Sequence, residues 1–193
     1  MADSPHPRVA IVRHGDTEWS REWRHTGRTD LPLTAEGRAR AEHMRARLVG
    51  RQFALVLTSP LQRARVTAEL AGFPDAEVCE DLLEWDYGDD EGRTSTDIRT
   101  ERPGWLIWAD GPKNGEAIDA VAARADRVID RVMGAGGDVL AFAHGHVLRI
   151  LAARWIDAEP TMGQRLLLGT ASPSTLGWEH DYRVIEHWSC DGD

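Results

Sequence analysis

Short, uninterrupted apolar runs separated by helix-like stretches constrain this chain most. Val9–Val12 and Val139–Ala143 contain no polar residue, and Ala54–Leu57 is a further run of this kind. A strand that is apolar on both faces is typical of a parallel sheet covered by helices on both sides. Between the runs, stretches such as Glu116–Met133 carry apolar residues at helical spacing. The sequence therefore predicts an α/β fold: a three-layer αβα sandwich around a central, mostly parallel sheet.

Local signals give the remaining elements. Thr34 is a plausible cap for a helix that runs to about Val49, and Ser59 could cap another helix with Pro60 at its first position. We also expect the following segments: a strand at Ala76–Cys79, a helix from His144 to about Trp155, strands or hairpins at Leu166–Leu168, Ser174–Trp178 and Val184–Trp188, and short helices and loops at Trp85–Lys113.

Composition bounds the class of protein. A length of 193 residues suits one domain, which we expect to span 1–193 with a lid-like segment near 85–116. The net charge of −9 argues against nucleic-acid binding, although a small anionic ligand responds to the local field of its cleft.

No apolar run reaches the ~20 residues of a membrane span, and the polar start does not resemble a signal peptide. Two cysteines, Cys79 and Cys190, form no framework of bridges. We therefore expect a cytoplasmic protein without membrane or nucleic-acid partners. The sequence leaves the oligomeric state open, with a homodimer as one possibility.

Two of the apolar runs end in the same dipeptide. Val9–Val12 leads into Arg13, His14 and Gly15, while Val139–Ala143 leads into His144 and Gly145. Ligands bind at the carboxyl ends of strands in open α/β sheets, so neighbouring strands would direct both imidazoles into one cleft. Each histidine alone could equally be a structural residue that satisfies local hydrogen bonds.

Two further residues fit an anion site. Arg63 falls at the start of the helix after Ser59 and Pro60, where the helix dipole also favours an anion, whereas Arg65 fits a solvated face. Glu84 follows two leucines, and partial burial would favour its protonated form, as a general acid requires.

These segments resemble the histidine phosphatase superfamily, also called phosphoglycerate mutase-like. The resemblance spans positions 9 to 149. The motifs that carry it are Val12-Arg13-His14-Gly15-Asp16-Thr17-Glu18-Trp19, Thr26-Gly27-Arg28-Thr29, Ser59-Pro60-Leu61-Gln62-Arg63-Ala64, Glu84-Trp85-Asp86-Tyr87-Gly88, Asn114-Gly115-Glu116 and Phe142-Ala143-His144-Gly145-His146.

The resemblance implies a role for each matching residue. His14 corresponds to the phosphorylated nucleophile, Glu84 to the proton donor, and Arg13, Arg63 and His144 to the phosphate pocket. In the mechanism we expect, His144 is protonated and, with the two arginines, neutralises the phosphoryl oxygens. It implies neither a metal nor an organic cofactor. The expected substrate or phosphate contacts are Ser20, Thr26, Gly27, Gly145, Trp85, Tyr87 and Trp108.

Departures from the family pattern favour one branch. Trp85 replaces an arginine of the mutases, and the chain lacks the insertion with which mutases hold phosphoglycerate. The sequence thus predicts a phosphatase for small phosphate monoesters, with sugar phosphates favoured by similarity to sedoheptulose-bisphosphatase-type members. The alternatives are a phosphoglycerate mutase and a non-catalytic phosphate-binding protein on the same fold.

Overall fold

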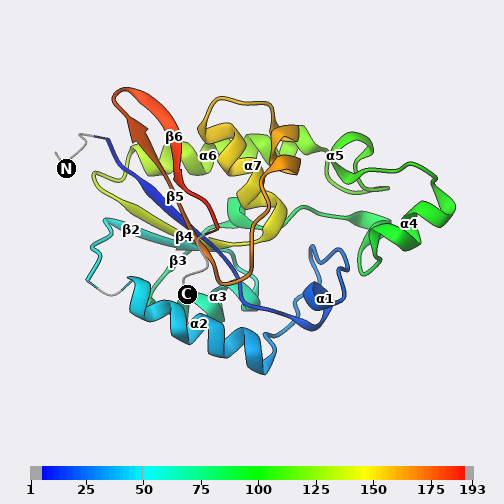
Figure 1. Ribbon diagram of the computed structural model, residues 1–193, viewed down its shortest axis with the longest axis horizontal. Helices are drawn as coiled ribbons and strands as arrows, with labels where there is room; N and C mark the ends of the chain where they lie inside the picture. Colours follow the sequence, from blue (N-terminus) through cyan, green and yellow to red (C-terminus); the bar gives the residue numbers. More distant parts are fainter. Residues whose placement is uncertain (1–5, 49, 190–193) are drawn as a thin grey trace.

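One mixed sheet organises the computed structural model, which describes residues 6–48 and 50–189. Within those residues, six strands lie in the order β3-β2-β4-β1-β5-β6 (Figure 1). Strands β1 to β4 are mutually parallel, whereas β5 runs antiparallel to β1 and β6 antiparallel to β5. The strands are β1 (Val9–Arg13), β2 (Leu55–Thr58), β3 (Glu77–Val78), β4 (Val139–Ala143), β5 (Pro173–Glu179) and β6 (Tyr182–His187).

Helices cover both faces of this sheet. The α-helices are α1 (Glu18–Arg21), α2 (Ala35–Leu48), α3 (Gln62–Leu70), α4 (Ser95–Glu101), α5 (Ile107–Asp110), α6 (Ile118–Met133) and α7 (Gly145–Trp155); the 3-10 helices are η1 (Glu80–Leu82), η2 (Gly88–Asp90) and η3 (Pro160–Arg165). Figure 1 shows α2 and α3 on one face and α6 and α7 on the other, which confirms the three-layer prediction.

The alternation of side chains along β1 explains the two faces. Val9 and Ile11 pack in the apolar cluster that contains residues of α6 and α7. Ala10 and Val12 pack instead with Met44 of α2 and Ala68 of α3. Both faces of β1 are therefore buried, as its uninterrupted apolar run predicts.

The structure corrects several local predictions. The helix expected to begin near Pro60 starts at Gln62, and no side chain caps it. Leu166–Leu168 forms no strand, although the two later tail segments form β5 and β6. Cys79 is buried as a free thiol, whereas Cys190 and Val49 lie outside the described residues. No helix among the described residues is long and apolar enough to cross a bilayer.

The segment between η1 and α6 has its own polar anchor. Asp90 is fully buried and accepts hydrogen bonds from the Arg102 side chain and from the backbone N–H of Lys113 (2.9 Å). One carboxylate thus joins both ends of a segment that otherwise holds only short helices. Figure 1 shows α4 and α5 projecting at one end of the molecule, away from the β5–β6 hairpin.

Candidate active site

The central strands β1 and β4 bring the two His-Gly dipeptides together. Arg13 pairs with Ala143 in parallel register, and the His14 N–H donates to the Ala143 carbonyl at 2.9 Å. His14 and His144 therefore follow at the same level, with ring centroids 5.1 Å apart. The parallel register of β1 and β4 thus brings the two imidazoles together, as the sequence predicts.

The local structure fixes the tautomer of His14. Its Nδ1 lies 2.7 Å from the Gly15 carbonyl oxygen, which can only accept, so Nδ1 carries the proton and Nε2 a lone pair. Burial, followed by the charges of Arg63 and Arg13, holds the pKa of His14 well below its usual value. The ring is consequently neutral, and His14 is part of the cavity lining.

Gly15 allows this arrangement because the chain passes very close to α2. A Cβ on Gly15 would lie 2.4 Å from the Gly37 carbonyl oxygen, a distance that no side chain tolerates. The Gly15 N–H donates to Thr67 Oγ1 of α3 at 3.0 Å. Two helices on one face of the sheet therefore fix the turn that positions His14.

His144 is neutral as well, which corrects the expectation of a protonated ring. Its Nδ1 accepts a hydrogen bond from Arg63 Nε (3.1 Å), so it holds no proton, and Nε2 donates to Ser59 Oγ (2.7 Å). Burial and the Arg63 charge lower the pKa of His144 well below its usual value. An imidazole that accepts from a guanidinium has no lone pair left for a second proton.

Arg63 is fully buried beside His144, and its guanidinium holds the loop that contains Thr26 and Thr29. Its guanidinium donates to the carbonyls of Thr26 (3.1 Å), Gly27 (2.9 Å) and Thr29 (2.8 Å). Neither Arg63 nor His144 is among the residues lining the cavity. Arg63 therefore supplies positive charge beside His14 and anchors the loop, but its hydrogen bonds are directed to protein groups.

Arg13 differs in this respect. Its Nη1 donates to the Leu168 carbonyl at 2.8 Å, while its buried Nε is the one buried side-chain N or O without a hydrogen-bond partner within the described residues. Buried donors are nearly always satisfied, so an orphan donor on the residue before His14 indicates a place for an acceptor from outside the chain.

Glu84 sits against the first turn of α7. Its Oε1 accepts from the backbone N–H groups of Trp85 and Val147, both at 2.9 Å, and its Oε2 accepts from the N–H of His146 at 3.0 Å. Three amide donors and a helix N-terminus stabilise the ionised carboxylate. The side chain is buried as expected, but these contacts favour the charged form over the predicted protonated one.

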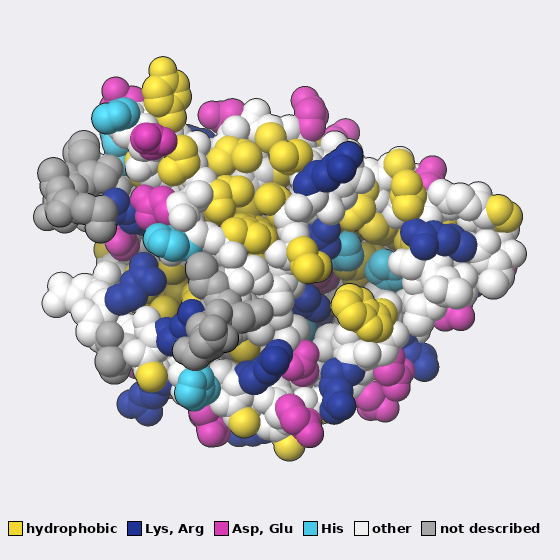
Figure 2. All heavy atoms as spheres, viewed as in Figure 1, with side chains coloured by type: hydrophobic (Ala, Val, Ile, Leu, Met, Phe, Trp, Pro, Cys, Tyr) yellow, Lys and Arg dark blue, Asp and Glu magenta, His cyan; other side chains and the backbone are white. Residues whose placement is uncertain are grey.

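A cavity of about 460 Å³ opens beside these groups, which is the size range of small-molecule sites (~300–1,000 Å³). Figure 2 shows histidine and basic side chains gathered in a hollow with hydrophobic side chains around it. Eight predicted site residues line the cavity: Arg13, His14, Ser20, Thr26, Glu84, Tyr87, Trp108 and Gly145. No group of three or more metal-ligating side chains suited to hold a metal occurs in the described residues.

Gly27 and Trp85 do not line this cavity. The indole of Trp85 is fully buried in the core, with its Nε1 donating to the Glu116 carbonyl (2.7 Å), which corrects its expected substrate contact. Gly27 lies behind the wall, where its N–H donates to Glu91 (2.9 Å). Gly27 and Trp85 therefore contribute to the packing around the cavity and do not face its interior.

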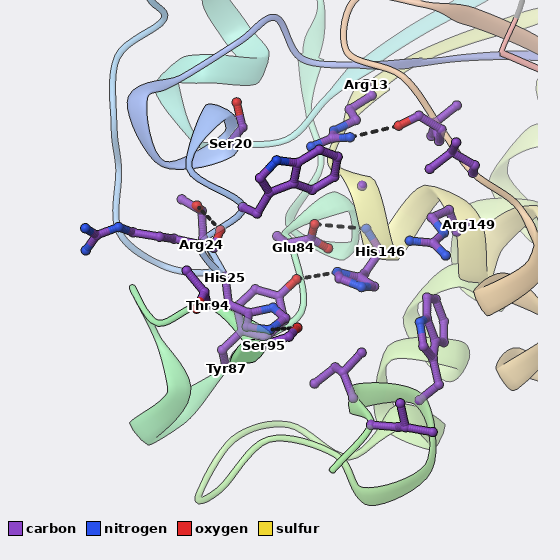
Figure 3. Close-up of a pocket in the computed structure, with 18 of the residues that line it drawn as sticks. Arg13, Ser20, Arg24, His25, Glu84, Tyr87, Thr94, Ser95, His146 and Arg149 are labelled. Atoms are coloured by element: carbon purple, nitrogen blue, oxygen red, sulfur yellow. Dashed lines mark hydrogen bonds between the residues drawn. The ribbon is translucent and has the colours of Figure 1, made fainter. Parts of the chain in front are cut away.

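Sequence reasoning missed several residues. Ser59 was expected to cap a helix but holds His144, and His146 and Arg149 of α7 face the cavity with Glu84 (Figure 3). Helical spacing could have shown this: His146 and Arg149 are three residues apart, so they share one face of the helix that follows the second His-Gly.

Comparisons with known proteins agree with this geometry. The sequence profile of the histidine phosphatase superfamily (branch 1) matches residues 9–191. An acid phosphatase of Mycobacterium tuberculosis is 39% identical over 183 residues, covering 92% of this chain and 90% of that protein. Sedoheptulose 1,7-bisphosphatase of Saccharomyces cerevisiae is 38% identical, covering 77% and 67%.

Solved structures extend the comparison to the whole fold. A structure from Mycobacterium tuberculosis superimposes with a TM-score of 0.90 at 38% identity, covering 95% of this chain and 97% of the other. A mycobacterial glucosyl-3-phosphoglycerate phosphatase gives 0.85 at 27% identity, covering 96% and 100%.

Proposed function

The chain belongs to the histidine phosphatase superfamily and is a phosphatase, and from that premise we propose that it hydrolyses small phosphate monoesters through a phosphohistidine on His14. The observation that carries this proposal is the state of His14. A neutral imidazole, with Nδ1 tied to a carbonyl and a lone pair on Nε2, is a competent nucleophile. The charges of Arg13 and Arg63 lower its pKa and also attract an anionic phosphate group.

The first step forms the bond from His14 Nε2 to phosphorus and breaks the bond from phosphorus to the ester oxygen. The orphan Nε–H of Arg13 donates to a phosphoryl oxygen, and the charge of Arg63 offsets the charge spread over the others. As the imidazole becomes cationic, the Gly15 carbonyl stabilises its Nδ1–H. In the second step water attacks phosphorus, the phosphorus–nitrogen bond breaks and inorganic phosphate leaves.

Glu84 handles the protons of both steps. Because its amide contacts favour the carboxylate, the proton for the leaving alkoxide has to arrive with the substrate as an ester monoanion. Glu84 relays that proton to the ester oxygen, then takes one from the attacking water and passes it to the departing phosphate, which restores the carboxylate. This reaction needs no metal.

Sugar phosphates are the substrate class we favour. Two similar proteins bear names of enzymes that act on sugar-derived phosphates, sedoheptulose 1,7-bisphosphatase and glucosyl-3-phosphoglycerate phosphatase. The cavity also suits polyols, because Ser20, Thr26 and Tyr87 line it with hydroxyl groups.

The covalent mechanism is tested with His14→Ala and a matched control, His43→Ala, whose side chain is exposed on α2. With EDTA present, His14→Ala should lose at least about 10³-fold of kcat on sugar phosphates, while His43→Ala keeps wild-type activity. Quenched wild-type turnover should yield an acid-labile, base-stable phosphoprotein that His14→Ala lacks. Undiminished hydrolysis by His14→Ala would refute the phosphohistidine.

The same preparations separate hydrolysis from mutase activity. A mutase would interconvert 2- and 3-phosphoglycerate when primed with a bisphosphoglycerate, whereas the proposed phosphatase releases inorganic phosphate and gives no interconversion. A phosphate-binding protein without catalysis would do neither.

A further inference from the structure

Four arginines line the cavity, and their partners distinguish them. Arg24 is paired with the Glu22 carboxylate at 2.6 Å, and Arg99 is exposed to water. Arg13 lies beside His14 and belongs to the proposed phosphoryl site. Arg149 is half-buried and, in the described part of the chain, its hydrogen bonds and ring contact involve no carboxylate.

The guanidinium of Arg149 is held rigidly. Its Nε donates to the Gly163 carbonyl at 2.8 Å and its Nη2 to the Gln164 carbonyl at 3.1 Å. The ring of Trp108 lies against its face, with 4.7 Å between Cζ and the ring centroid. A Cβ on Gly163 would come within 2.8 Å of the Trp108 ring, so these groups are closely packed. A side chain ordered in advance loses little entropy when it binds an anion.

Arg149 lines the cavity, and its Nη1 is the guanidinium nitrogen that these contacts leave available. No hydrogen-bond partner of its Nη1 occurs among the described residues, and Figure 3 shows the group directed toward the space that Glu84 and His146 also face. Burial lowers the pKa of Arg149, but a guanidinium stays charged at any physiological pH. The charge of Glu84 acts on Arg149 without a direct hydrogen bond or ion pair between them among the described residues, so a partly desolvated guanidinium keeps room for an anionic ligand.

The helix sets the spacing between this cation and the proposed phosphoryl site. Gly145 lines the cavity at the start of α7, and Arg149 lies four residues later, about 6 Å along the helix axis. His146 lies between them, with its Nδ1 engaged by Tyr87 at 2.6 Å, so the aromatic wall there is also fixed. One small molecule can therefore span both points.

We propose that Arg149, stacked on Trp108, forms a second anion subsite that binds a second acidic group of the substrate, either a phosphate or a carboxylate. This inference rests on the proposed function, because it assumes that the scissile phosphate lies at His14. It narrows the substrate class to esters that carry two acidic groups a few bonds apart.

The test compares paired substrates that differ by one acidic group. A hexose 1,6-bisphosphate is compared with the hexose 6-phosphate, and 3-phosphoglycerate with glycerol 3-phosphate. The readout is the ratio of kcat/KM within each pair, for wild type, Arg149→Gln, Arg149→Lys and Arg65→Gln. Arg65 is exposed on α3 and provides a matched loss of one charge.

Wild type should prefer the diacid in at least one pair. Arg149→Gln should reduce that preference by about 10- to 100-fold, the usual value of a charge-assisted hydrogen-bonded contact. Arg149→Lys should retain part of it, and Arg65→Gln all of it. A drop in the bisphosphate pair identifies a second phosphate, and a drop in the phosphoglycerate pair identifies a carboxylate. A ratio unchanged in Arg149→Gln overturns the subsite, since a purely structural role would affect both members of a pair alike.

A binding measurement keeps this result independent of turnover. In the His14→Ala background, calorimetry should show that the diacid binds more tightly than its monoacid partner and that adding Arg149→Gln removes the difference. If wild type hydrolyses none of the esters, the proposed function fails while this titration still decides on the subsite. Equal affinities for diacid and monoacid with Arg149 present contradict it.

Discussion

His14 illustrates how position alone can prepare a reactive group. Among the described residues, the charges that act on the pKa of His14 are those of Arg63 and Arg13, and both oppose its protonation. In the proposed mechanism, the same arginines that attract the phosphate also keep His14 in its neutral, nucleophilic form. Electrostatics therefore serve binding and activation at once.

This arrangement predicts an unusual pH profile. Because the pKa of His14 is depressed well below 6.5, this proposed nucleophile should stay unprotonated as the pH falls through that value. The rate should instead decline on the alkaline side, as the ester loses its second proton near pH ~6 and no longer delivers it to Glu84. We expect kcat/KM to show no acidic limb near pH 6.5, measured with an alkyl phosphate while circular dichroism confirms the fold. An acidic limb centred near 6.5 would contradict the assigned state of His14.

At the scale of elements, α7 is the part on which the site depends most. Its first turn binds the Glu84 carboxylate, its preceding residue is His144, and its next turn carries Arg149. A single helix thus joins the Glu84 carboxylate, the His144 imidazole and the Arg149 guanidinium.

Glu84→Gln tests the proton relay at this helix. The amide is nearly isosteric and keeps one acceptor oxygen for the amides of α7, but it cannot relay a proton. We expect kcat to fall by about 10²- to 10⁴-fold for an alkyl phosphate, and far less for p-nitrophenyl phosphate, whose leaving group needs no protonation. Steady-state kinetics on both esters, with thermal unfolding as the control for folding, measures this. Equal losses on the two esters would contradict an acid role for Glu84.

The sequence predicted most of these elements and the meeting of His14 with His144, because apolar strands and helical periodicity depend on local pattern. It missed features that depend on tertiary contacts. Ser59 looks like a helix cap in isolation, yet the approach of β4 gives its hydroxyl a stronger partner in His144. Trp85 could not be separated from Trp108 by sequence, since only packing decides which indole enters the core. The backbone N–H groups that hold the Glu84 carboxylate likewise come from His146 and Val147, 62 and 63 residues later in the sequence.

For the whole molecule, buried neutral histidines link stability to pH. His14, His25, His144 and His146 all have lowered pKa values, chiefly because of burial, and that of His25 is lowered to about 4. Unfolding exposes these rings, whose pKa returns to about 6.5. Between these values the unfolded chain binds more protons, so stability falls as the pH is lowered from about 6.5 toward 4.

Each such histidine contributes a slope of at most about 1.4 kcal/mol per pH unit in that window. Urea unfolding between pH 7 and 4.5 should therefore show a steep loss of the free energy of unfolding. His25→Gln should reduce that slope by about 1 kcal/mol per pH unit. Identical slopes for wild type and His25→Gln would contradict the buried neutral state of His25.

The central place of β1 has a consequence for how the protein is made. Its partners β4 and β5 begin 130 and 164 residues later, at Val139 and Pro173. At ordinary rates of translation the first strand leaves the ribosome roughly 10 to 30 seconds before the last of its neighbours exists. During that interval its apolar run lacks native partners and is a natural target for chaperones. The proposed nucleophile His14 directly follows β1, so its site is completed only when β4 and α7 have been synthesised.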